Sequence, residues 1–250
     1  MREKYRLPRE NKVKILGVDT SLDRLNIGLI EDRIILAETA REAKGILAEI
    51  IIDSIDRTLR EAKTSLSELS GLAISIGPGS FTGLRVGLSV LKGMAWSSNL
   101  PLLAIPTFEA LVYQSGEKER PVAVVIQGKQ GVILAGVYEF KKTLPILKGE
   151  FFTSQLHHLP EKIPPQALLI VLGGNLEVAQ LKKSLPGREI LINNEAGVLR
   201  GSSVAFLGLE KLKQGQAVDP KNVEPIYLQK AIYRSPIKYE RVHYPHNDRG

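Results

Sequence analysis

The sequence predicts an α/β protein built from two similar halves. Short apolar runs, typical of buried strands, alternate with stretches whose apolar residues recur at helical spacing. After the polar segment 115–121 a similar rhythm begins again, and both halves open with three strand-like runs. The chain has 250 residues, 43% of them hydrophobic, so it can bury a core as one domain or two small ones. These observations favour a duplicated α/β unit.

The elements of the first half follow from local patterns. The breaks between the first three apolar runs are short, which suits hairpins, and the next stretch carries one apolar stripe at helical spacing. We expect strands at 14–21, 25–32, 33–40, 72–76 and 100–106, and helices at 43–62, from the glycine-rich turn to about 98, and from Thr107.

The second half is less regular, and its last stretch is rich in proline. We expect strands at 122–127, 131–140, 144–152 and 167–175, and helices at 175–184 and 202–213. The predicted organisation is a first α/β subdomain over 12–106, a second over 107–216, and an extended basic tail over 217–250.

Composition excludes several classes of protein. The net charge of +7 favours either an anionic partner or a generally basic surface, and both remain open because the cations are scattered. The chain has no cysteine, which excludes disulfides and thiolate metal sites. No apolar run approaches the ~20 residues of a membrane span, and the charged start is unlike a signal peptide. We therefore expect a soluble cytoplasmic protein with no membrane partner.

The stretch "SIGPGSFTGLRVGLSVLKG" (75–93) joins a strand to a helix through glycines, an arrangement that commonly holds phosphate. A P-loop lysine is missing, and Thr82 stands where a dinucleotide fingerprint has its third glycine. We expect a structural turn, with Ser80 or Thr82 capping the helix. The residues of this glycine loop are Gly77, Pro78, Gly79, Ser80 and Thr82.

The helix after the loop is apolar over most of its circumference, which indicates burial on two sides. One side faces the sheet, and glycines on another side would let a second element approach closely. The preceding helix has more apolar residues than one contact requires. The two helices either pack on each other or form a surface for another chain. The predicted surface comprises Ile46, Leu47, Ile50, Gly83, Gly87, Val90 and Met94.

Several strings together identify a family resemblance. They are "ILGVDTS" near the start, the 43–62 helix, "SIGPGSFTGLRVGLSVLKGMA", "LPLLAIPTFEAL" and, near the end, "VEPIYLQK". The chain resembles the TsaB (YeaZ) family, closely over 13–112 and more loosely beyond. This resemblance implies the two-subdomain fold of the sugar kinase, Hsp70 and actin group.

The resemblance also implies a function. TsaB-like proteins are subunits of the bacterial machinery that forms N6-threonylcarbamoyladenosine in tRNA. The chemistry, with its nucleotide (ATP or ADP) and metal, belongs to a paralogous subunit, TsaD, and an ATPase, TsaE, joins them. The implied role here is a non-catalytic platform that binds TsaD through its first two helices and meets tRNA in the assembled complex. A homodimer would compete for the same surface, and no cofactor is expected in the isolated chain.

Two positions depart from the family pattern. Family members commonly have an acidic residue and an arginine after the first strand of the second half, where this chain has Gln127-Gly128-Lys129. The usual glycine-aspartate-glycine of a later strand end is "GGN" here, with Asn175 last. The platform role does not depend on these residues.

Two enzymatic alternatives remain open. ATPases of this fold place a carboxylate where Asp19, Thr20 and Ser21 end the first strand, which makes these residues weak nucleotide-binding candidates. Because Gln127 replaces the second carboxylate, a magnesium site here would have only one carboxylate ligand, which holds Mg²⁺ poorly. We therefore prefer a role for Asp19 in structural hydrogen bonding. A stand-alone ATP-dependent enzyme is thus one alternative. A glycoprotease-type metallopeptidase is another, but no zinc-type histidine motif is present, and we predict no catalytic residue and no metal site.

The predicted tail combines basic and aromatic residues. Such a mixture can bind RNA through phosphate contacts and stacking, or it can simply be solvated. The candidate RNA-binding residues are Lys230, Arg234, Lys238 and Arg241.

Overall fold

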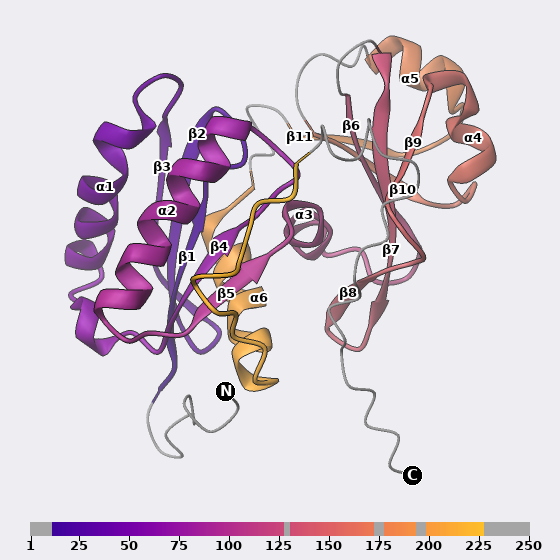
Figure 1. Ribbon diagram of the computed structural model, residues 1–250. Helices are drawn as coiled ribbons and strands as arrows, with labels where there is room; N and C mark the ends of the chain where they lie inside the picture. Colours follow the sequence, from indigo (N-terminus) through magenta and orange to yellow (C-terminus); the bar gives the residue numbers. More distant parts are fainter. Residues whose placement is uncertain (1–11, 128–130, 173–177, 194–198, 228–250) are drawn as a thin grey trace.

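Two mixed β-sheets form the framework of the molecule (Figure 1). The computed structural model describes residues 12–127, 131–172, 178–193 and 199–227. The first sheet has the order β3-β2-β1-β4-β5 and contains β1 (Lys14–Asp19), β2 (Arg24–Glu31), β3 (Ile34–Glu42), β4 (Gly71–Ser75) and β5 (Leu102–Ile105). The second has the order β11-β10-β6-β7-β8, with β9 also paired to β7. Its strands are β6 (Val122–Gln127), β7 (Ile133–Lys141), β8 (Leu144–Leu147), β9 (Phe152–Ser154), β10 (Leu168–Leu172) and β11 (Ile190–Asn193).

The second sheet repeats the topology of the first. In the first, β1, β4 and β5 are parallel, and β2 runs antiparallel to β1. In the second, β6, β10 and β11 are parallel, and β7 runs antiparallel to β6. Strand β6 therefore corresponds to β1, β7 to β2 and β8 to β3. This repetition confirms the predicted fold class of two similar α/β subdomains.

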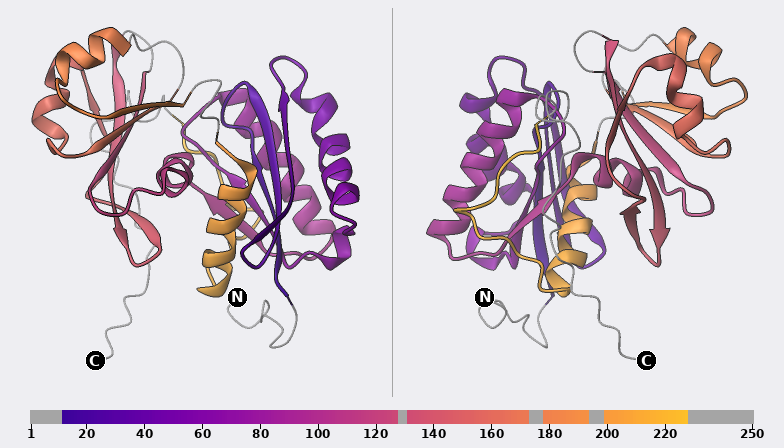
Figure 2. Two further views of the ribbon diagram at one scale, coloured as in Figure 1. Left: turned by 180° about the vertical axis from the view of Figure 1, so that it is seen from behind. Right: turned by 45° about the vertical axis from the view of Figure 1, so that its right-hand side comes forward.

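Helices and sheets alternate in five layers (Figures 1 and 2). Helices α1 (Leu47–Glu61) and α2 (Phe81–Ser97) cover the outer face of the first sheet, and α3 (Thr107–Ser115) and α6 (Gly201–Lys213) lie between the sheets. Helices α4 (Leu159–Lys162) and α5 (Val178–Ser184) cover the outer face of the second sheet. Each pair of adjacent faces encloses buried apolar residues. Within the described residues, no helix is long and apolar enough to cross a membrane.

The expected boundaries differ from the observed ones at two glycines. The helix expected at 43–62 begins only at Leu47, because Gly45 has φ +80°, outside the helical region. The strand expected at 144–152 is divided into β8 and β9, since Gly149 takes φ +79° between them. Strand β11 and helix α4 were not expected.

Helix α6 corrects the predicted boundary between the subdomains. The sequence order assigned it to the second half (107–216), but it packs on β1, β2 and β4 of the first sheet. Glycines permit this contact: a Cβ atom added at Gly201 would lie 2.1 Å from the Gly28 nitrogen. The Glu38 carboxylate accepts hydrogen bonds from Ser202 N (3.1 Å) and Ser202 Oγ (2.8 Å) at the start of α6. The chain thus returns to the first half after building the second.

The start of the predicted tail also lies on the first half. The strap, residues 217–227, runs along the edge of the first sheet and the side of α2 (Figure 2). Val218 N donates to Leu102 O (2.8 Å), and Ile226 N donates to Ile76 O (2.7 Å). The first part of the predicted extended tail, the strap, is therefore packed on the first half of the chain. The rest of that segment lies outside the described residues.

Candidate functional site

The glycine loop forms the turn between β4 and α2. Gly77 has φ +105°, a conformation that glycine adopts readily, and the peptide bond to Pro78 is cis. Ser80 is the residue that caps α2, because its Oγ accepts a hydrogen bond from Gly83 N at 3.3 Å. Thr82 lies exposed on the first turn of the helix.

The glycines of this region pack against the loop between β1 and β2. A Cβ atom added at Gly79 would lie 2.3 Å from Ser21 O, and one at Gly83 would lie 2.2 Å from Thr20 O. At Gly87 it would lie 2.2 Å from Thr20 Oγ1. The prediction that Gly83 and Gly87 face another chain is therefore wrong, because this chain's own loop occupies that side of α2.

Leu47 is a second correction to the predicted surface. Its side chain is buried in the core between α1 and the sheet, with 9% of the residue exposed, which leaves little of it for a partner. Ile46 precedes the helix and is 43% exposed. Ile50, Val90 and Met94 pack against the core only in part.

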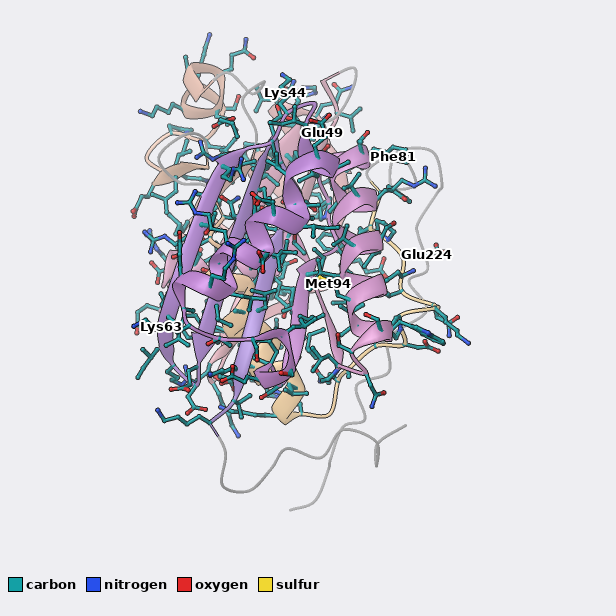
Figure 3. All side chains as sticks on the ribbon, turned by 90° about the vertical axis from the view of Figure 1, so that its left-hand side faces the viewer. Lys44, Glu49, Lys63, Phe81, Met94 and Glu224 are labelled. Carbon is teal, nitrogen blue, oxygen red and sulfur yellow. The ribbon has the colours of Figure 1, made fainter. Side chains whose placement is uncertain are left out.

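The surface that remains is the α1–α2 face, which we define as Ile46, Ile50, Val90 and Met94. Figure 3 looks onto it: Glu49 and Phe81 mark one end of the two helices, and Met94 lies further along between them. Packing of α1 on α2 covers these side chains only partly, so the two helices do pack on each other and leave some apolar surface open. That another chain binds this surface stays a prediction.

Asp19 ends β1 in a closed set of hydrogen bonds. Its side chain is fully buried, and its Oδ1 accepts from Ser21 N at 3.1 Å and from Ser75 Oγ. Its Oδ2 accepts from Asn26 Nδ2 at 3.4 Å. Burial raises the pKa of the Asp19 carboxyl above its usual range, while these hydrogen bonds oppose the shift. That Asp19 serves only in structural hydrogen bonding stays a prediction.

Polar groups near Asp19 are buried but lack protein partners. Thr20 Oγ1 and Ser21 Oγ find no hydrogen-bond partner among the described residues. Gln127 ends β6 as Asp19 ends β1, and its Oε1 is likewise buried without a partner in the described part of the chain. The two strand ends therefore supply one carboxylate and one amide. Gly128, Lys129 and Asn175 lie outside the described residues.

The histidines that the structure describes do not form a metal site. His157 and His158 lie in the short helix η3 (Leu156–His158), with ring centroids 4.1 Å apart. His158 Nδ1 lies 3.3 Å from Glu161 Oε1. Over the ranges described, no three His, Asp or Glu side chains gather closely enough to hold a metal ion. The candidate RNA-binding residues Lys230, Arg234, Lys238 and Arg241 lie outside those ranges.

Comparison with known proteins connects this geometry to a family. The family model described as TsaD, tRNA N6-adenosine threonylcarbamoyltransferase, matches residues 41–188. A Bacillus subtilis (strain 168) protein described as tRNA threonylcarbamoyladenosine biosynthesis protein TsaB is 27% identical over 223 residues, which are 87% of this chain and 94% of that protein. An Escherichia coli (strain K12) protein of the same description is 23% identical over 88% of this chain and 96% of that protein. The chain belongs to the TsaB family.

The TsaB-family chain also resembles a solved structure in its fold and a transferase in part of its sequence. The solved structure described as YeaZ from Pseudomonas aeruginosa has a TM-score of 0.68 and 19% identity, covering 86% of this chain and all of that one. A Brachyspira hyodysenteriae tRNA N6-adenosine threonylcarbamoyltransferase is 31% identical over 48% of this chain, a match that spans 42% of that enzyme. The TsaB-family chain therefore shares part of its sequence with the transferases themselves.

Sequence reasoning missed the aromatic contacts of the strap. Tyr227 packs on Phe81 at a ring-centroid distance of 4.9 Å, and Arg85 lies over the Phe81 ring at 4.8 Å. Lys221 lies over the Trp96 ring at 4.7 Å. The string "VEPIY" was the part of the sequence that could have indicated these contacts, but nothing in its spacing shows which helix it packs against.

Proposed function

We propose that this chain is a non-catalytic platform subunit in the formation of N6-threonylcarbamoyladenosine in tRNA. In this proposal it binds a TsaD-type transferase through the α1–α2 face. The observation that carries the proposal is the apolar surface that α1 and α2 leave uncovered, in a chain whose relatives are described as TsaB biosynthesis proteins.

The relation between the chain and the transferases supports this choice of partner. The family model that matches residues 41–188 is that of the transferase, so the proposed partner contains a region related to this one. Two related halves can pair through equivalent helices about an approximate two-fold axis. The same geometry would allow a homodimer, which would compete for the α1–α2 face.

The strand ends support a role without catalysis in the isolated chain. Asp19 is held by Ser21, Ser75 and Asn26, and the corresponding strand ends in Gln127. We infer that ATP or ADP and the metal act in the partner subunits, including a TsaE-type ATPase. A stand-alone ATP-dependent enzyme is the second candidate, because Asp19 ends β1 beside two buried hydroxyls that lack described partners.

Reconstitution separates these candidates. The purified chain, a TsaD-type subunit and a TsaE-type ATPase from the same organism would be combined with unmodified tRNA, and the modified nucleoside measured by mass spectrometry. We expect product only when the chain is present, and neither product nor steady ATP hydrolysis from the chain alone. Steady hydrolysis by the chain alone that disappears in Asp19→Asn would instead establish the enzymatic candidate.

A further inference from the structure

We propose that the strap positions α2 for partner binding, with the packing of Tyr227 on Phe81 as the coupling contact. This inference rests on the proposed function, because it concerns how the α1–α2 face is held. It assigns a role to the "VEPIY" segment, which the platform role alone leaves unexplained.

Helix α2 depends on its surroundings for its position. It contains Gly83, Gly87 and Gly93, and each glycine costs roughly 1 kcal/mol of helix propensity relative to alanine. On its inner side, the first two of these glycines pack against the β1–β2 loop. Contacts with other segments therefore have to fix where α2 lies, since its own sequence favours a helix only weakly.

The strap meets α2 at both ends. Near the C-terminal end, the Lys221 ammonium lies over the Trp96 ring, and Val223 packs against the core beneath the helix. At the N-terminal end, the rings of Tyr227 and Phe81 lie 4.9 Å apart at an interplanar angle of 38°. The strap thus spans the helix and is attached at each end by an aromatic ring.

The glycine loop is shaped to receive the strap. Ile226 N donates to Ile76 O at 2.7 Å, immediately before the loop. A Cβ atom added at Gly77 would lie 2.5 Å from Ile226 O, so the strap backbone occupies the space that a side chain would need. Any displacement of the strap would therefore change the packing at the turn that precedes α2.

The anchored end of the strap lies at the same end of the helices as exposed apolar surface. Phe81 is 53% exposed and carries Arg85 over its ring. Figure 3 places Phe81 at the same end as Lys44 and Glu49, beside the start of α1, where Ile46 is also exposed. Among the described residues, Arg85 has no carboxylate within ion-pair distance. An exposed aromatic–arginine stack next to apolar side chains has the composition of an interface hot spot.

The test measures affinity for the TsaD-type subunit and hydrogen exchange in α2. We expect Tyr227→Ala to weaken binding roughly three- to tenfold, the range that loss of an aromatic pair allows, and to speed amide exchange over residues 81–90. Tyr227→Phe keeps the ring and should behave like wild type. Phe81→Ala combined with Tyr227→Ala should weaken binding no more than Phe81→Ala alone, because the Tyr227 ring acts only through its contact with Phe81.

The matched control is Tyr113→Ala. Tyr113 on α3 packs on Phe206 of α6 with the same interplanar angle of 38°, in the layer between the sheets. It should lower stability without changing affinity or exchange in α2. Wild-type affinity and wild-type exchange in Tyr227→Ala would overturn the inference, and so would additive losses in the double variant. If charges placed on the α1–α2 face abolish binding while Tyr227→Ala does not, the inference fails and the platform function stands.

Discussion

Gly87 and Gly93 lie on the same helix in opposite surroundings. A Cβ atom at Gly87 would lie 2.2 Å from Oγ1 and 2.9 Å from Cγ2 of the fully buried Thr20, whereas one at Gly93 would meet nothing within 4 Å. We expect Gly87→Ala to lower the free energy of unfolding by about 1–3 kcal/mol through overpacking. Gly93→Ala should raise it by about 0.5–1 kcal/mol through helix propensity. Urea unfolding measures both, and equal effects would contradict the assigned contact.

Asp19 should give stability a pH dependence of defined sign. Burial raises the pKa of the Asp19 carboxyl in the folded protein above its usual range, so the folded state holds this proton to higher pH than the unfolded state does. Its contribution is therefore most favourable at low pH and decreases as pH rises through the window between the two pKa values.

The variant Asp19→Asn removes this titration. Measured by urea unfolding from about pH 4 to about pH 8, the stability of wild type relative to the variant should fall as pH increases. A difference that is constant, or that grows with pH, would show that the hydrogen bonds from Ser21, Ser75 and Asn26 outweigh burial.

At the scale of elements, the spacing of apolar residues predicted which helices and strands form, but not where each of them packs. Strands β1, β2 and β4 and helices α1 and α2 follow from apolar periodicity, because each buries one face or both against a neighbour. The periodicity of 202–213 predicts helix α6 but not which of the two sheets it packs on. Almost all of the helix is buried, so it has no polar side that would indicate its orientation. The same limit explains Gly83 and Gly87: the sequence indicates a close approach to α2, but not that Thr20 makes it.

Helices α3 and α6 are joined by an ion pair in the layer between the sheets. Lys211 Nζ lies 3.2 Å from Glu109 Oε2 and donates to Ala104 O at 3.1 Å, with both side chains almost buried. Lys211→Met should lower the free energy of unfolding by about 3 kcal/mol, because it leaves the Glu109 carboxylate unpaired. Adding Glu109→Gln should recover most of that loss.

The exposed pair Arg57–Glu61 on α1 provides the control for that experiment. Glu61→Gln should leave the urea midpoint unchanged, because water screens an ion pair on the surface. A loss in Lys211→Met no larger than that in Glu61→Gln would show that the pair between α3 and α6 contributes nothing to holding the layers together.

At the scale of the whole molecule, the strap brings the chain back to α2 after both sheets are complete. Residues 228–250 follow Tyr227 directly and carry five Lys or Arg against Glu240 and Asp248. If this segment contacts tRNA, its deletion should weaken tRNA binding by the assembled complex and flatten its salt dependence, because fewer counterions are released. Filter binding over a salt series measures the slope, and an unchanged slope would exclude the contact.

The candidate site was predictable only in outline. The excess of apolar residues on two consecutive helices indicates a second contact, and Ile46, Ile50, Val90 and Met94 do remain partly open. Leu47 could not be excluded from sequence, since an interface leucine and a core leucine have the same pattern. The strap was missed because an irregular segment has no periodicity from which a packing partner follows.

The most direct measurement of the central claim is the affinity of the chain for the TsaD-type subunit after charges are placed on the α1–α2 face. Ile50→Glu combined with Met94→Glu should weaken binding, measured by titration calorimetry, by roughly a hundredfold or more, as loss of two interface hot spots implies. Ile34→Glu on β3, an exposed apolar position of the same half, should bind like wild type. A double variant that keeps its circular dichroism spectrum and binds the subunit with wild-type affinity would contradict the account.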